Sequence, residues 1–214
     1  MLRTRNLLLS LSVFLTGCST GNLDLKLVED VNAGRTEEVK ALLSRGADAN
    51  AQNEHGKTAL MLASSAGRSE IVQALLGAGA NANAEDMGGR TALIMAARKG
   101  HAEIVRALLE GGADVRKKLG EGSTALTSAI KEGHTEIVRT LLDAGADPNG
   151  KHGNRATELM EATYAGHTEI VRMLLDAGAD PNVQHKGSNA VLDIARKHGH
   201  EAISQLLMEA GAKE

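Results

Sequence analysis

Aromatic residues are nearly absent from this sequence, which has one Tyr, one Phe and no Trp among its 214 residues. A core built on large rings is therefore excluded. The hydrophobic content of 42% must come mainly from Leu, Ile, Val, Met and Ala, which suit closely stacked helices. A content of this size is typical of an ordinary folded protein and excludes a chain that is disordered throughout.

A strong excess of charge of one sign is also absent. The 24 Lys and Arg residues and the 27 Asp and Glu residues give a net charge of -3, and no run of five basic residues occurs. Nucleic acid is therefore not expected as a partner, because binding to its phosphates needs a concentrated basic surface.

Cysteine is limited to Cys18, so no disulfide can form within the chain. The apolar stretch from Leu7 to Leu15 is about nine residues long, whereas a membrane-spanning helix needs roughly 20. This stretch follows Arg3 and Arg5 and ends just before the cysteine. The arrangement is typical of an export signal and disfavours a transmembrane anchor.

The segment Leu-Thr-Gly-Cys at 15–18 resembles the lipobox of bacterial lipoproteins. The resemblance implies a signal peptide over 1–17, a lipid attached to Cys18 and a short tether over 18–23. With Ser19 after the cysteine, it also implies a location in the bacterial cell envelope, with the lipid in the outer membrane and the protein facing the periplasm. Contact with the membrane is then expected through the lipid alone. The alternative is a small buried cysteine in a protein without a signal.

Two glycine positions recur every 33 residues without a slip. The first set is Gly34, Gly67, Gly100, Gly133, Gly166 and Gly199, and the second is Gly46, Gly79, Gly112, Gly145, Gly178 and Gly211. A fixed period of this length indicates a repeat array, and glycine is favoured where a helix ends with positive φ.

The unit from 91 to 113 shows what is repeated. Apolar residues at helical spacing predict one short helix over 92–97 and a second over 104–110, joined by a turn that contains Gly100. Helices of this length are only marginally stable alone, so we expect the units to stack and to share one core.

Three motifs carry a resemblance to the ankyrin-repeat family. Thr-Ala-Leu starts at 58, 91 and 124, Gly-His-x-Glu-Ile-Val at 100, 133 and 166, and Leu-Leu-x-x-Gly-Ala-Asp/Asn at 75, 108, 141 and 174. The resemblance implies an all-α fold over 24–214, an ankyrin-repeat solenoid of six stacked helix-turn-helix units with hairpin-like loops. The repeats are expected at about 24–52, 53–85, 86–118, 119–151, 152–184 and 185–214.

The family's Thr-Pro-Leu-His motif is not kept in full. Its histidine position holds Met61, Ile94, Thr127 and Met160. Hydrogen bonds that this histidine provides between units are then lost, and we expect a less rigid stack. The end units are expected to be caps, because Glu38 and Ser204 stand where inner units have Ile and Val.

Other histidines recur at the turn between the two helices. They are His101, His134, His167 and His200. Stacking places equivalent residues about 10 Å apart, whereas zinc holds its nitrogen ligands at about 2 Å. A shared metal site is therefore excluded, and we expect these histidines to bond to backbone. His152 and His185 are expected at loop tips with a similar role.

The sequence gives no support for catalysis. It has no motif of a serine hydrolase, a phosphate-binding loop or a zinc protease. The recurring aspartates of the Gly-Ala turns are expected to bond within the turns, and the second helices are expected to form modest ion pairs on a solvated convex face. These aspartates are Asp48, Asp114, Asp147 and Asp180, and the helix charges include Glu103, Arg106, Glu136, Arg139, Glu169 and Arg172. We therefore expect neither an enzyme nor a bound cofactor or metal.

The resemblance implies a partner protein, bound on a concave surface made by the loops and the exposed side of the first helices. The repeat register places on it His55, Lys57, Arg90, Arg98, Lys99, Glu121, Lys131, Glu132, Asn154, Tyr164, Lys186, Asn189, Lys197 and His198. Basic residues are the largest group, which suggests an acidic surface on the partner. We expect Tyr164, Arg98 and Arg90 to contribute most, because Tyr and Arg are enriched among interface anchors. The alternative is that these are ordinary solvated side chains, and the chain itself is expected to be a monomer.

Similar exported bacterial ankyrin proteins are associated with catalase function. This favours a non-catalytic periplasmic scaffold that binds or protects an envelope protein such as a catalase. The alternative is an immunity protein that inhibits a periplasmic toxin such as a secreted phospholipase effector. Both functions need only a specific concave surface, so the sequence leaves both open.

Overall fold

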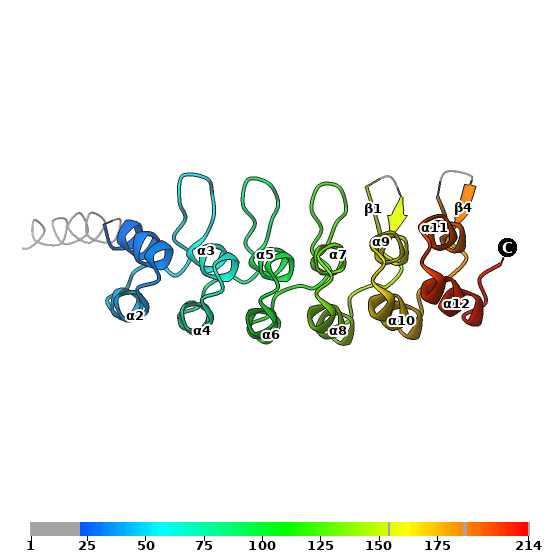
Figure 1. The fold of residues 1–214 in the computed structure, drawn as a ribbon. Helices are drawn as coiled ribbons and strands as arrows, with labels where there is room; N and C mark the ends of the chain where they lie inside the picture. Colours follow the sequence, from blue (N-terminus) through cyan, green and yellow to red (C-terminus); the bar gives the residue numbers. More distant parts are fainter. Residues whose placement is uncertain (1–21, 154, 186–187, 214) are drawn as a thin grey trace, which may run out of the picture.

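The structure, a computed structural model, describes residues 22–153, 155–185 and 188–213, which form a line of helix pairs (Figure 1). The first pair is a helix through residues 22–33 and α2 (Thr36–Ser44). The following pairs are α3 (Ala59–Ser65) with α4 (Ser69–Gly77), α5 (Ala92–Lys99) with α6 (Ala102–Glu110), α7 (Ala125–Lys131) with α8 (Thr135–Asp143), α9 (Glu158–Ala165) with α10 (Thr168–Asp176), and α11 (Val191–Lys197) with α12 (Glu201–Glu209). Residues 22 and 23, which are expected in the tether, lie in this first helix.

Between successive pairs the chain forms loops that project from one side of the array (Figure 1). We call these loops, at 51–58, 84–91, 117–124, 150–157 and 183–190, the fingers. In the last two fingers β1 (Lys151–His152) pairs antiparallel with β2 (Ala156–Thr157), and β3 (Gln184–His185) with β4 (Ser188–Ala190). These are the expected hairpin-like loops, and the all-α repeat fold is confirmed.

The recurring Thr and Gly residues determine where the first helices begin and end. The Thr91 hydroxyl accepts a hydrogen bond from the Ile94 amide at 3.3 Å, and the same bond begins α3, α7 and α9. The helix α5 ends at Gly100, whose φ of 80° places it in the left-handed region. Glycine adopts this conformation without the steric penalty of a Cβ atom.

The hydrophobic core runs along the array between the two rows of helices. Its regular members are the Ile and Val residues of the second helices, none more than 1% exposed. They are Ile71, Val72, Ile104, Val105, Ile137, Val138, Ile170 and Val171. Because each side chain packs against neighbouring units, burial of apolar surface stabilises the stack and not the isolated unit.

Hydrogen bonds also join neighbouring units. The His101 Nε2 atom lies 3.4 Å from the Ser65 carbonyl oxygen, and His134 Nε2 lies 3.2 Å from that of Arg98. The expected backbone bonding is confirmed for these two histidines. Between the first two units, Arg68 occupies the repeat position of these histidines. Its guanidinium donates to the carbonyl oxygens of Val31 and Asn32, near the end of the preceding first helix.

Asparagine side chains connect the turns that follow successive second helices. Asn83 donates from Nδ2 to the Gly112 carbonyl at 2.8 Å, and its Oδ1 accepts from the Asp114 amide at 2.7 Å. We call this pair of bonds the asparagine bridge, which Asn149 and Asn182 repeat. Bonds between units are therefore present although the family's histidine is replaced, because other positions supply them. The reduced rigidity of the stack stays a prediction.

The turn aspartates bond within their turns, as expected. The Arg116 amide donates to Asp114 Oδ1 at 2.9 Å, as the Asn149 amide does to Asp147 Oδ1. Arg116 therefore lies in the same kind of turn as the bridge asparagines. In the described part of the chain, however, its side chain forms neither bond of the asparagine bridge.

On the convex face, ion pairs form both between units and within single helices. Arg106 Nη1 lies 2.7 Å from Glu136 Oε1, and Arg139 Nη2 lies 3.7 Å from Glu169 Oε1. The contacts of Arg172 with Glu169, at 3.6 Å, and of Lys40 with Glu37, at 2.9 Å, each stay within one helix. Since all these side chains are largely exposed, each pair contributes little to stability.

The two end units differ in how they accommodate a polar residue. Glu38 is exposed, as expected for a cap. Ser204 is only 9% exposed, and its hydroxyl donates to the His200 carbonyl at 3.2 Å. The last unit thus tolerates a polar residue through a bond within α12.

Candidate functional site

Most predicted binding residues have exposed side chains on the fingers or at the ends of the first helices. They are His55, Arg98, Lys99, Glu121, Lys131, Glu132, Tyr164, Lys197 and His198. Lys57 and Arg90 are half-buried. Cys18, Asn154 and Lys186 lie outside the described residues, as does the side chain of Asn189.

Tyr164 lies near the end of α9 and is 65% exposed. Its ring contacts that of His198 edge to face, with the centroids 4.9 Å apart and an interplanar angle of 74°. The His198 ring in turn stacks on His200 at 5.9 Å. These contacts hold Tyr164 against the last unit. A partner that covers this tyrosine gains a large contact area at a small loss of side-chain freedom.

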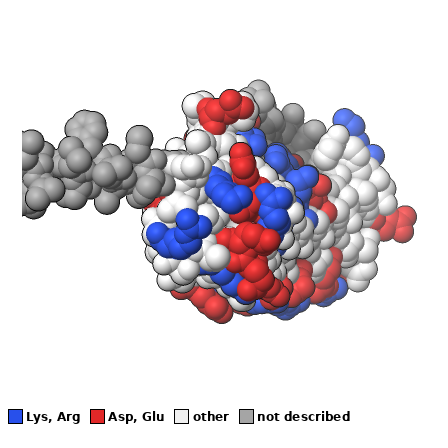
Figure 2. Space-filling view, turned by 90° about the vertical axis from the view of Figure 1, so that its left-hand side faces the viewer, with Lys and Arg blue, Asp and Glu red and all other residues white. Residues whose placement is uncertain are grey.

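Three cations share the register position of Tyr164 on other first helices, namely Arg98, Lys131 and Lys197. We call these four residues the central row. Lys131 Nζ lies 3.7 Å from Glu161 Oε1 of the next unit, whereas no ion pair of Arg98 or Lys197 occurs among the described residues. The end of the array shown in Figure 2 has Lys and Arg mixed with Asp and Glu. The cationic character therefore belongs to the central row and not to every surface.

Arg90 already has a partner within its own finger. Its guanidinium binds Asp86 Oδ2 through Nη2 at 2.8 Å and through Nε at 2.9 Å. Burial of Asp86 acts to raise its pKa, but hydrogen bonds from Arg90 and from the Gly88 amide, together with the Arg90 charge, lower that pKa overall. Arg90 thus helps to hold its finger in shape.

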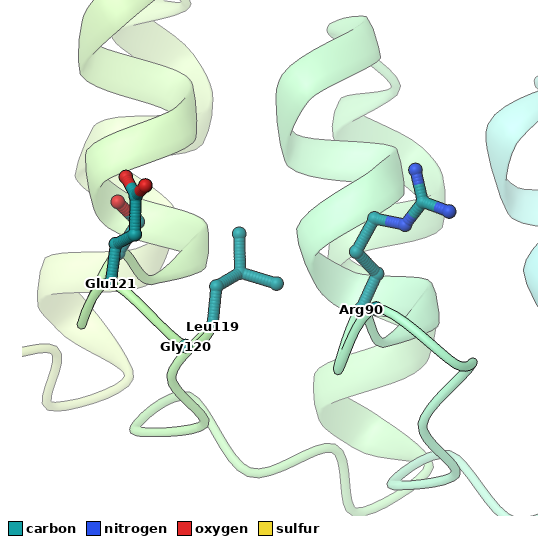
Figure 3. A pocket seen from close by; sticks show the side chains of 6 residues that line it. Arg90, Leu119, Gly120 and Glu121 are labelled. Atoms are coloured by element: carbon teal, nitrogen blue, oxygen red, sulfur yellow. The ribbon is translucent and has the colours of Figure 1, made fainter.

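Arg90 and Glu121, both predicted to bind a partner, line one open pocket of about 320 Å³ between their fingers. Leu119 lies between them (Figure 3). This leucine was not among the predicted residues. Leu119 occupies the repeat position of Asp86, whose carboxylate accepts a hydrogen bond from the Gly88 amide of its finger. An apolar residue at this otherwise polar position is the only feature of the sequence that sets Leu119 apart.

His152 is buried, and its expected position at a loop tip is wrong. It is 5% exposed, with Nε2 3.8 Å from Glu158 Oε2 and Nδ1 3.9 Å from Glu161 Oε1. The physical reason is that His152 lies at the base of its finger. It occupies the repeat position that the buried Asp86 occupies in another unit. Burial lowers the pKa of His152. The side chain of His185 is not described.

Glu158 begins α9 and is only 1% exposed. Its Oε1 accepts a hydrogen bond from Thr127 Oγ1 at 2.7 Å, while Oε2 has no hydrogen-bond partner in the described structure. Burial raises its pKa to about 8. A buried carboxyl at this position was not predicted from the sequence. The available signal was that positions 59, 92 and 125 all hold Ala.

No metal-binding group of three or more His, Cys, Asp or Glu side chains is found in the described ranges. The helices there include none with the length and apolar character to cross a membrane.

Comparisons with known proteins agree with this architecture. A family model described as ankyrin repeats, in three copies, matches residues 27–119, 78–152, 111–185 and 150–214. A crystal structure of an ankyrin repeat domain from Acinetobacter baumannii AYE is similar, with 36% sequence identity and a TM-score of 0.83 over 88% of this chain and 98% of that chain. The comparison with curated proteins found no match.

Proposed function

This chain belongs to the ankyrin-repeat family, and from that premise we propose that it is a non-catalytic scaffold that binds another protein through its fingers and the ends of its first helices. Ankyrin repeats generally mediate binding to proteins. A linear stack presents successive side chains along a surface, but it does not gather reactive groups at one point. We therefore assign the surface to recognition.

The observation that carries the proposal is the central row of Arg98, Lys131, Tyr164 and Lys197. It places an exposed aromatic ring among cations, two of which have no ion pair among the described residues. Aromatic and Arg side chains are the usual anchors of interfaces. The row favours a partner with acidic groups, which the cations attract and orient.

The location forms the second part of the proposal. We propose that Cys18 carries a lipid and holds the scaffold at the periplasmic side of a bacterial outer membrane. The support is the lipobox-like Leu-Thr-Gly-Cys at 15–18 after a short apolar stretch. The scaffold then binds or protects an envelope protein such as a catalase.

Affinity capture tests the binding surface. The tagged chain is produced in its native host, and the proteins that it captures from the cell envelope are identified. They are compared with the proteins captured by the double variant Arg98→Glu, Tyr164→Ala. The matched control is Arg172→Glu, which changes an exposed cation on the opposite row of helices. We expect an acidic partner whose recovery falls about tenfold or more in the double variant but not in the control.

Equal recovery by the double variant would show that the surface is placed wrongly. The identity of the partner separates the two functions that the sequence left open. A catalase supports the scaffold, whereas a secreted phospholipase bound one-to-one and inhibited supports an immunity protein. Turnover of a substrate by the purified chain alone would contradict both.

A further inference from the structure

The exposed cations and the open pocket between the fingers belong to the binding surface proposed above. A separate feature is the polar contact of α9 with α7, where Glu158, His152 and Thr127 meet. Six buried side-chain polar atoms lack a hydrogen-bond partner among the described residues. Four of them belong to the fifth unit, on His152, Glu158, Thr163 and His167. Unpaired buried groups weaken a contact, so this unit is docked less firmly than its neighbours.

The equivalent contacts elsewhere show what is unusual. At positions 59, 92 and 125, which correspond to Glu158, three other units bury the small side chain of Ala, and the last unit buries Val191. Here a carboxyl group occupies the position, and its Oε2 lies 3.8 Å from the unpartnered His152 Nε2. An ionised carboxylate at this place has one hydrogen bond, from Thr127, and little solvent. Such an environment favours the neutral form.

We infer that this contact is a proton-operated joint, in which a neutral Glu158 carboxyl keeps the fifth unit docked on the fourth and loss of its proton accompanies local opening of α9 from α7.

The charged groups around Glu158 do not cancel the preference of its carboxyl for the neutral form. Glu161 on α9 and Asp147 in the turn after α8 raise the Glu158 pKa further, whereas Lys131 on α7 lowers it. Arg116 and Lys118 line a small pocket of about 150 Å³ that also reaches Glu158 and Asp147. In the described structure, α10 and α11 contribute no charged group to the shift. Burial remains the largest cause.

The direction of the pH effect follows from the two states. The closed joint holds Glu158 at a pKa of about 8, whereas an open, solvated carboxyl has its ordinary value of 4.5. Opening therefore releases a proton and becomes more favourable as pH rises from 4.5 to about 8. The lowered pKa of His152 has the opposite effect on opening, because this imidazole takes up a proton when it becomes solvated. That effect matters mainly below its ordinary pKa of 6.5. Between about pH 6.5 and 8.5, opening should increase about 20-fold.

Opening would also reach the proposed binding surface, because Tyr164 lies on α9. The joint itself does not depend on that function, and its test needs no partner.

Hydrogen–deuterium exchange of the full chain provides the test. Exchange is measured near pH 6.5 and pH 8.5, each corrected for the intrinsic rate, and protection in α9 is compared with protection in α3 and α5. The test variant is Glu158→Gln, which keeps the shape but cannot ionise. The control is Glu121→Gln, at an exposed glutamate on a finger.

In the unchanged chain, protection of α9 should fall about 20-fold more than that of α3 and α5 as the pH rises. Glu158→Gln should abolish the difference, and Glu121→Gln should retain it. The joint is refuted if α9 follows α3 and α5 in the unchanged chain, or if Glu158→Gln keeps the difference. Should Glu158→Gln fail to fold, Glu158→Ala supplies the same test with the residue found in other units.

Discussion

The asparagine bridge that is missing at Arg116 can be restored by one substitution. Arg116 lies in the same kind of turn as Asn149, since both amides bond to an aspartate two residues earlier. Arg116→Asn should therefore donate to the carbonyl of Gly145 and accept from the amide of Asp147. The reverse change, Asn83→Ala, removes the existing bonds of 2.8 and 2.7 Å to Gly112 and Asp114.

The magnitude follows from the two bonds. Each intramolecular hydrogen bond contributes about 0.5–1.5 kcal/mol net, and the bridges lie near solvent, so we take the lower half of that range. Arg116→Asn should raise the free energy of unfolding by about 1–2 kcal/mol, and Asn83→Ala should lower it by a similar amount. Urea unfolding followed by circular dichroism at the helix band measures both changes.

The control is Arg116→Ala, which removes the arginine without adding a bridge. If Arg116→Asn is no more stable than Arg116→Ala while Asn83→Ala loses stability, the turn at Arg116 cannot form the bridge and the reasoning fails. If Asn83→Ala is also neutral, these bonds do not stabilise the stack at all.

Two further predictions concern the repeat turn and the N-terminus. Gly100→Ala should lower the free energy of unfolding by about 2 kcal/mol, because φ is 80° and a Cβ atom would lie 2.8 Å from His134 Cε1. Gly79→Ala has a similar φ of 85° and open space around it, so thermal unfolding should show a smaller loss, and equal losses would exclude a role for the histidine contact. Cys18→Ser should abolish labelling with a lipid precursor and release the chain from the membrane fraction. Unchanged fractionation would mean that the N-terminal segment was misinterpreted.

The regular parts of the fold could be predicted from the sequence because they depend on local rules. Thr91 and Gly100 begin and end their helix through bonds and dihedral angles close along the chain. The 33-residue period then places Ile104 and its equivalents in one core, since every unit repeats the same contacts. The regular contacts of one unit are therefore sufficient to predict those of the next unit.

The irregular parts could not be predicted, because they depend on side chains that meet only through the folding of a finger or the stacking of neighbouring units. Glu158 reads as an exposed helix N-terminal carboxylate until Thr127, 31 positions earlier, is placed against it. Arg90 reads as a free cation until the finger folds back and brings Asp86 to it. The asparagine bridge likewise joins positions 83 and 112, whose proximity follows only from the pitch of the stack.

The single tyrosine has a practical consequence for anyone who studies this chain. Because the chain has no Trp that could accept its excitation energy, the fluorescence of Tyr164 can be observed directly. Its phenol stands on the face assigned to recognition, edge-on to the imidazole of His198. The molecule thus contains a built-in optical probe on that face, and binding of a partner that itself lacks Trp and Tyr can be followed without any attached dye.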